Sequence, residues 1–309
     1  MSAREVVVLP DAEVLAQSVA ARLLIRLLDV QSVRRPAHLV VTGGTVGIGI
    51  LAAAATSPLR GVVDWSGVHV WWGDERFLPT GHPDRNETQA RGALIDALGD
   101  ELPAENVHPM PAADAPGIGS PEDSAAAYAL ELAKFAEAVD AAPTSSGALA
   151  ETALYPDTAS HAAFGDHASM AAFGDRAARA AFDESAAAAT AAAGHAPDGV
   201  PAFDVLLLGM GPDGHIASLF PGHPELEVSD TSTVGVHASP KPPPERVSLT
   251  LSAIHAAREV WLVAAGPEKA DALASALDGA PVATTPAAAA VGRDRTLWLI
   301  DAAAASPGR

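Results

Sequence analysis

The residues best suited to acid–base chemistry are Asp213 and His215, in a glycine-rich run that follows an apolar segment at 203–208. Histidine is the usual general base near neutral pH. A neighbouring carboxylate can fix its tautomer and raise its basicity. We therefore expect a rigid loop that presents this pair at the end of a strand. A histidine that only packs or caps is the alternative.

A second polar run, Asp74-Glu75-Arg76, comes directly after an apolar stretch at 68–72. Arg76 can clamp a phosphate through two parallel hydrogen bonds. Asp74 or Glu75 can orient that arginine or do acid–base work. Asp74 also competes with Asp213 as the group that orients the imidazole. A surface cluster of ion pairs is the alternative interpretation.

Two further segments are suited to anions. The first, Thr42, Gly43, Gly44 and Thr45, separates a predicted strand from a predicted helix. Backbone N–H groups, the hydroxyls and the positive end of the helix dipole can hold a phosphate there. An ordinary capped turn is the alternative, and no Gly-Lys-Ser/Thr follows as in a P-loop.

In the second segment, three prolines and a glutamate separate Lys241 from Arg246. Prolines stiffen the backbone and so fix where the two cations point, which suits anion recognition. The alternative is a rigid surface linker.

A nucleotide cofactor and a metal both fit the sequence poorly. The glycines of 209–214 have dinucleotide-binding spacing, but Pro221 and Gly222 interrupt the next segment after about two turns, too early for the helix of that fingerprint. His215 and His223 are separated by this break, and no histidine pair has the helical spacing of a zinc site. The sequence therefore predicts neither.

The surrounding elements alternate between strand and helix patterns. Strands are expected at 6–9, 38–41, 68–72, 203–208, 246–251, 259–264 and 296–300. Helices are expected after the N-cap Asp11 and at 46–55, 86–98, 121–138 and 267–277. This rhythm predicts an α/β fold with a Rossmann-like, open, mostly parallel sheet and helices on both faces. Ligands of such sheets bind beyond the carboxyl ends of the strands.

Residues 141–200 break the pattern. They are dominated by alanine, and Ala-Ala-Phe-Gly-Asp occurs at 162–166 and again at 171–175. We expect a low-complexity insertion in a single domain that spans 1–309. A short helical pair is the alternative.

The composition narrows the classes of function. A net charge of −19 argues against nucleic acid and anionic membranes as partners, so any anion site must be locally basic. The chain has no cysteine, which excludes disulfides and thiolate chemistry. The sequence shows neither a signal peptide nor a membrane span. We expect a cytoplasmic protein, as a monomer or a small homo-oligomer.

Taken together and in this order, the segments resemble the 6-phosphogluconolactonase family. The resemblance is carried by residues 42–45, 72–76, 209–222 and 241–246, of which 209–222 is the longest and most specific. It covers the whole chain except 141–200.

The resemblance implies a fold like that of glucosamine-6-phosphate deaminase and ribose-5-phosphate isomerase. It implies cofactor-free hydrolysis of 6-phosphoglucono-δ-lactone to 6-phosphogluconate in the oxidative pentose phosphate pathway. His215 would be the general base, while Arg76, Lys241 and Arg246 would hold the phosphate or the carbonyl oxygen. The chain has Thr42 where the family usually has serine, which leaves the details of phosphate contact open.

Two other functions are weighed against this one. Deamination of an amino-sugar phosphate needs a carboxylate base and a ring-opening histidine, which Asp74 and His215 can supply. The deaminase pattern, however, has an aromatic residue in place of Arg76 and a Phe-Asn-Glu run that is absent after 216–217. A sugar-phosphate sensor would need a DNA-binding module, and residues 1–40 contain no basic helix-turn-helix.

Overall fold

The computed structural model describes residues 4–141 and 199–306. The predicted insertion at 141–200 lies almost wholly outside these residues, so its low-complexity character stays a prediction. Residues 4–139 and 199–306 form one unit, in which segments from both sides of the insertion share a sheet. None of the helices in the described ranges combines the length and the hydropathy that a membrane span requires.

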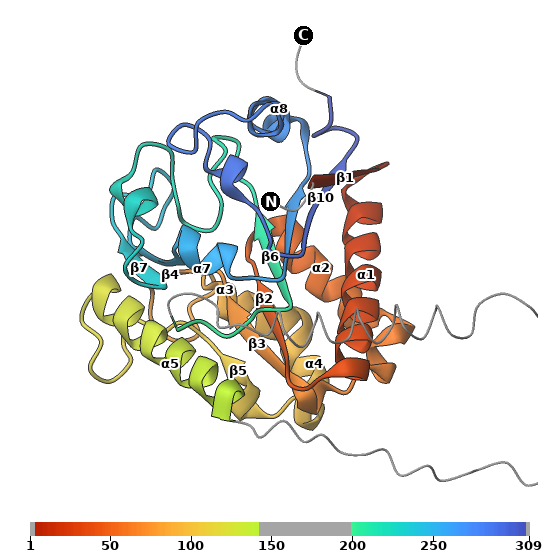
Figure 1. Cartoon of the computed structure of the whole chain (residues 1–309), viewed down its shortest axis with the longest axis vertical. Helices are drawn as coiled ribbons and strands as arrows, with labels where there is room; N and C mark the ends of the chain where they lie inside the picture. The colour runs from red at the N-terminus through yellow and green to blue at the C-terminus, as the bar shows by residue number, and fades with distance from the viewer. Residues whose placement is uncertain (1–3, 142–198, 307–309) are drawn as a thin grey trace, which may run out of the picture. The chain divides into compact units, whose positions relative to one another are not determined.

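Seven parallel strands form the central sheet, in the order β1-β10-β9-β6-β2-β3-β5 (Figure 1). They are β1 (Arg4–Leu9), β2 (Ala37–Val41), β3 (Val68–Trp72), β5 (Val107–His108), β6 (Val205–Gly209), β9 (Glu259–Ala264) and β10 (Arg295–Asp301). From the middle of the sheet, β2, β3 and β5 follow one another outward on one side, and β6, β9 and β10 on the other. The order therefore reverses between β2 and β6, and open α/β sheets bind ligands at such a point.

Helices cover both faces of this sheet, as predicted. They are α1 (Ala12–Val33), α2 (Gly44–Thr56), α3 (Asn86–Ala90), α4 (Asp96–Leu98), α5 (Pro121–Ala141), α7 (Leu251–His255) and α8 (Ala270–Leu277). Because side chains alternate across a strand, Leu39 and Val70 line an apolar cavity with Leu51 of α2. Trp71, by contrast, packs on α5, with its ring centroid 5.1 Å from that of Phe135. Figure 1 shows α1 and α5 on opposite sides of the sheet.

The helix boundaries follow local signals. Asp11 is the N-cap of α1, as predicted, and its Oδ1 accepts a hydrogen bond from Val14 N at 2.9 Å. Residues 86–98, predicted as one helix, form α3 and α4 joined by a π-helical turn over Arg91–Ile95. The predicted helix at 267–277 begins with a 3₁₀ turn over Pro267–Lys269 and continues as α8.

A second, antiparallel sheet was not predicted. It consists of β4 (Asp74–Arg76), β8 (Arg246–Leu249) and β7 (Thr233–Val236), in that order. Asp74–Arg76 was expected to be a loop, and its pairing with β8 joins segments about 170 residues apart, which no local pattern reveals. The strand predicted for 246–251 ends at Leu249, because Thr250 caps α7.

The segment after Gly214 also differs from expectation. We expected about two helical turns there, but residues 215–222 contain no helix. Ile216 instead forms isolated β-bridges with Met210 and Leu219. The segment is therefore a folded loop that returns toward the end of β6.

Candidate active site

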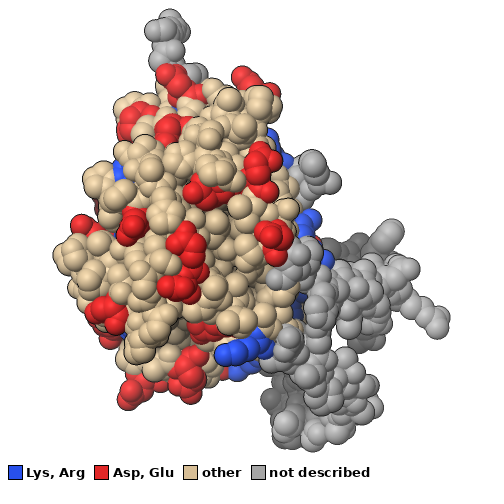
Figure 2. Space-filling view, turned by 90° about the vertical axis from the view of Figure 1, so that its left-hand side faces the viewer, with Lys and Arg blue, Asp and Glu red and all other residues tan. Residues whose placement is uncertain are grey.

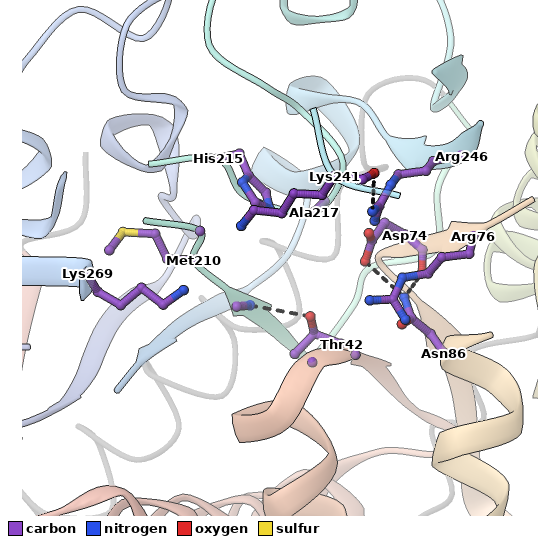
Figure 3. Close-up of a pocket in the computed structure, with 14 residues that line it drawn as sticks. Thr42, Asp74, Arg76, Asn86, Met210, His215, Ala217, Lys241, Arg246 and Lys269 are labelled. Carbon is purple, nitrogen blue, oxygen red and sulfur yellow. Dashed lines mark hydrogen bonds between the residues drawn. The ribbon is translucent and has the colours of Figure 1, made fainter. Parts of the chain in front are cut away.

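One cleft lies at the carboxyl ends of β2, β6 and β9, beside the small sheet (Figure 3). Its lining residues are Thr42, Gly43, Gly44, Asp74, Arg76, Asn86, Gly209, Met210, Gly211, His215, Ala217, Lys241, Arg246 and Lys269. All four sequence segments singled out for chemistry contribute to it. Of the predicted residues, Thr45 and Asp213 do not line its wall.

The histidine of the cleft is paired with the predicted carboxylate. His215 Nδ1 lies 2.6 Å from Asp213 Oδ1, and the imidazole is 14% exposed. Partial burial raises the pKa of Asp213, but the hydrogen bond and charge of His215 outweigh it and lower this pKa to about 2. An ionised carboxylate only accepts hydrogen bonds, so Nδ1 is the donor of the pair. The neutral ring therefore keeps its lone pair on Nε2, which has no partner among the described residues.

Two glycines make this arrangement possible. A Cβ on Gly211 would lie 2.0 Å from His215 Nδ1 and 2.4 Å from Asp213 Oδ1, so the pair occupies the space above that residue. Gly214 has a φ of +83°, which L residues rarely adopt. The loop is closed by hydrogen bonds from Gly211 N to His215 O at 2.9 Å and from Gly214 N to Gly211 O at 3.0 Å.

The predicted phosphate turn lies at the floor of the cleft. Gly43 is the N-cap of α2, a helix of 13 residues, and Gly44 is its first residue. The unsatisfied N–H groups and the positive dipole end of such a terminus favour an anion. Thr42 joins the turn to the neighbouring strand, because its Oγ1 accepts a hydrogen bond from Gly209 N at 3.4 Å.

Arg76 extends from β4 into the cleft (Figure 3). Its Nη1 donates to the carbonyl oxygen of Asp84 at 2.7 Å, which fixes the guanidinium. Its Nε is buried and has no partner among the described residues. The antiparallel pairing of β4 with β8 places Arg76 directly opposite Arg246.

Arg246 is held by the proline segment that precedes it. Its Nε donates to Pro243 O at 3.2 Å, and its Nη2 donates to Lys241 O at 3.1 Å and to Pro242 O at 3.2 Å. Its guanidinium carbon lies 5.9 Å from the centre of the Phe220 ring. These contacts leave Nη1 without a partner in the described part of the chain.

Asp74 does not orient the imidazole. Its Oδ2 accepts a hydrogen bond from Ser218 Oγ at 2.7 Å, and its Oδ1 lies 3.3 Å from Asn86 Nδ2. Both carboxylate oxygens are therefore engaged with neighbours other than His215. The structure places Asp213, and not Asp74, against the ring.

Glu75, which follows Asp74, points away from the cleft and is 1% exposed. Its carboxylate accepts backbone hydrogen bonds from Arg76 at 2.8 Å, Asn86 at 2.6 Å and Glu87 at 2.9 Å. Burial raises the pKa of Glu75 to about 7, against the opposing effects of the Arg85 charge and these N–H groups. Glu75 therefore holds the start of α3 in place.

Two lining residues, Lys269 and Asn86, were missed by the sequence reasoning. Lys269 lies just after β9, and Figure 3 shows its side chain directed into the cleft. Burial lowers the pKa of its ammonium, and the charge of Lys241 lowers it further. Applying the strand-end rule to β9, whose end is marked by Gly266, would have found Lys269. No sequence signal points to Asn86.

The charge of the cleft is opposite in sign to the net charge of the chain, which is −19. Acidic side chains dominate the face of the molecule drawn in Figure 2, and basic ones are few. The cleft, in contrast, is lined by Arg76, Lys241, Arg246 and Lys269, with Asp74 as its one lining carboxylate. It is thus locally basic, as an anion site on an acidic protein requires. In the described residues, no three His, Asp or Glu side chains are grouped to hold a metal ion.

Comparison with known proteins places this chain in a family. A family model described as glucosamine-6-phosphate isomerases/6-phosphogluconolactonase matches residues 10–149 and 142–298. The chain is 46% identical over 302 residues to a 6-phosphogluconolactonase of Streptomyces coelicolor, covering 98% of this chain and 94% of that protein. It is 37% identical over 299 residues to a 6-phosphogluconolactonase of Mycobacterium tuberculosis, covering 97% and 96%.

Solved structures agree on the fold. A 6-phosphogluconolactonase from Trypanosoma cruzi superposes with a TM-score of 0.70 at 19% identity, covering 99% of this chain and 97% of that one. A 6-phosphogluconolactonase from Thermotoga maritima gives a TM-score of 0.65 at 19% identity, covering 97% and 100%. From the matched residues and the identity with its relatives, the chain belongs to the 6-phosphogluconolactonase family, within the group of glucosamine-6-phosphate isomerases and 6-phosphogluconolactonases.

Proposed function

We propose that this chain hydrolyses 6-phosphogluconolactone to 6-phosphogluconate in the pentose phosphate pathway, with His215 as the general base. The observation that carries the proposal is the Asp213–His215 pair, because His215 lines a cleft with four cations and its Nε2 has no partner among the described residues. Family membership supplies the substrate, a phosphorylated sugar lactone. We place the reaction in the cytoplasm, since the substrate is a small soluble metabolite.

The proposed reaction begins with a water molecule at His215 Nε2. The imidazole takes a proton from this water as its oxygen bonds to the C1 carbonyl carbon of the lactone. The bond between C1 and the ring oxygen then breaks, and the imidazolium returns the proton to that oxygen, which becomes a hydroxyl. Asp213 stabilises the imidazolium between the two steps. A positioned base contributes about 10²–10⁴-fold, which suits an ester that is already reactive.

Two of the four cations of the cleft have separate tasks in this proposal. Arg76, fixed by Asp84, offers donors for the oxygen on which negative charge develops. The Gly43–Gly44 turn and Lys269 bind the phosphate, because a helix N-terminus and an ammonium together suit a dianion. Contacts to the phosphate bind the substrate and the transition state alike, so they act mainly on KM.

Replacement of Lys269 tests this division of tasks. Lys269→Met removes the charge and keeps the chain length. A hydrogen bond to a charged group contributes about 1.5–3 kcal/mol, so KM should rise about 10- to 150-fold while kcat changes little. Steady-state hydrolysis of freshly prepared lactone, coupled to the oxidation of 6-phosphogluconate, measures both constants.

The matched control for Lys269→Met is Lys134→Met, on the exposed surface of α5. This variant should leave both constants unchanged. A fall in kcat at constant KM in Lys269→Met would place the lysine at the reacting carbonyl and contradict the assignment. Absence of lactone hydrolysis by the wild type, with release of ammonia from glucosamine 6-phosphate, would replace the proposed function with deamination.

A further inference from the structure

Gly43 and Gly44 are glycines for different reasons. Gly44 has a φ of +77°, and a Cβ there would meet nothing within 4 Å. Gly43 has an ordinary backbone, with φ −81° and ψ −160°, which any residue can adopt. A Cβ on Gly43 would lie 1.9 Å from Asn86 Oδ1 and 2.4 Å from Asn86 Cγ, and its third neighbour is Asn86 Nδ2 at 3.0 Å. The carboxamide of Asn86 therefore occupies the space of the side chain that Gly43 lacks.

The orientation of that carboxamide is set by its neighbours. Asn86 Nδ2 donates to Asp74 O at 2.8 Å and lies 3.3 Å from Asp74 Oδ1. The backbone N–H of Asn86 donates to Glu75 Oε1 at 2.6 Å, and the residue is 2% exposed. A flipped amide would place Oδ1 against two oxygens of Asp74, so Oδ1 must face Gly43. This oxygen is buried and accepts no hydrogen bond from the described residues.

We propose that Asn86 is a positioning residue that holds the Gly43–Gly44 turn at a fixed place relative to β4, the strand that carries Arg76. The inference rests on the assignment of the substrate phosphate to this turn. The carboxamide is bonded to Asp74 on one side and is in contact with Gly43 on the other. In this proposal, the carboxamide of Asn86 joins the turn that binds the phosphate to the strand whose Arg76 faces the C1 carbonyl of the lactone.

A double-mutant cycle tests this coupling. Asn86→Ala removes the contact and should raise KM for 6-phosphogluconolactone about three- to tenfold, the effect of losing one or two ordinary hydrogen bonds, with kcat nearly unchanged. Gly43→Ala in the wild type forces the carboxamide out of its place between Gly43 and Asp74 and should raise KM about tenfold. In the Asn86→Ala background, the three atoms nearest to the added Cβ are absent, so Gly43→Ala should raise KM little more. Multiplicative effects of the two substitutions would overturn the proposal.

Gly44→Ala is the matched control. Its cost arises from the backbone conformation and not from Asn86, so it should be the same with and without Asn86→Ala. If the rise in KM caused by Gly44→Ala disappears in the Asn86→Ala background, Asn86→Ala has loosened the whole turn. That result would contradict a specific contact between Asn86 and Gly43. Circular dichroism melting of every variant identifies those that fail to fold, and Asn86→Ser serves as a smaller change if Asn86→Ala unfolds.

A second substrate separates this inference from the proposed function. Glucono-δ-lactone lacks the phosphate, so its kcat/KM should be unaffected by Asn86→Ala. An Asn86→Ala effect on kcat or melting temperature alone, without a change in KM, would reduce Asn86 to a structural residue. If Lys269→Met leaves KM unchanged while the coupling between Gly43 and Asn86 persists, the assignment of the lysine fails and the positioning role stands. Equal changes in KM for both lactones would refute the positioning of a phosphate-binding turn.

Discussion

Among the described residues, two histidines pair through Nδ1 with a carboxylate at almost the same distance, and only one of the two lines the cleft. His215 Nδ1 is 2.6 Å from Asp213 Oδ1 at the carboxyl ends of the strands. His108 Nδ1 is 2.7 Å from Glu131 Oε1, between the sheet and α5. Their hydrogen-bond lengths therefore do not distinguish a reactive histidine from a structural one.

The surroundings of the two rings do distinguish them. The second ring nitrogen of His108 lies 2.8 Å from His69 Nδ1, and the ring stacks on Trp71 with centroids 3.9 Å apart. Both nitrogens of His108 are thus engaged in a packed interior. His215 keeps one nitrogen free beside four cations that can hold an anionic substrate. A free lone pair and a place for the substrate, and not the carboxylate partner alone, indicate a catalytic histidine.

The largest expected effect is a fall in kcat when the imidazole of His215, with its free nitrogen, is removed. His215→Ala should lower kcat by about 10²–10⁴-fold with little change in KM, because a base contributes only to the chemical step. His108→Asn should leave kcat unchanged and lower the melting temperature, since it leaves Glu131 and His69 without their partner. Lactonase kinetics and thermal unfolding of both variants measure the contrast. Near-normal turnover by His215→Ala would refute the assignment of His215 as the general base.

A smaller loss of kcat is expected from Asp213→Asn. The amide keeps the shape but cannot stabilise the imidazolium, and a hydrogen bond to a charged group contributes about 1.5–3 kcal/mol, or about 10- to 150-fold in kcat. Because the pKa of Asp213 is lowered to about 2, its protonation should not limit kcat anywhere above pH 4 or so. Stopped-flow or pH-stat assays across this range test both statements. The same kcat in Asp74→Asn and Asp213→Asn would argue against a special role for Asp213.

The smallest expected effect concerns the buried histidines and acid stability. Burial, together with the charges of His69 and His108, lowers the pKa of His38 to about 3. In the unfolded chain His38 binds a proton near pH 6.5, so below this pH the unfolded state binds more protons than the folded state. The free energy of unfolding should therefore decrease as pH falls from about 6.5, by up to about 1.4 kcal/mol per pH unit for this residue.

Urea unfolding at several pH values between 7 and 5 measures this slope. His38→Gln should flatten it, because glutamine does not titrate and can still accept the hydrogen bond that Trp71 Nε1 donates to His38 at 3.1 Å. Parallel slopes for the wild type and His38→Gln would show that other groups govern acid stability.

Much of the fold and of the candidate site followed from local sequence. Apolar runs that end in glycine and polar residues predict buried parallel strands, and the carboxyl ends of such strands lie at one edge of a sheet. That rule predicts that Thr42, Arg76 and His215 lie close together, and all three line the cleft. Asp11 was recognised as an N-cap because capping is a local hydrogen bond.

The tertiary structure alone decided the contacts between distant segments. It paired β4 with β8, bonded Asp74 to Ser218 and not to the imidazole, and placed the carboxamide of Asn86 over Gly43. These outcomes depend on packing between residues tens to hundreds of positions apart, and no periodicity or capping signal encodes such distances. The sequence by itself determined which side chains reach the end of the sheet, whereas close packing determined which of them touch.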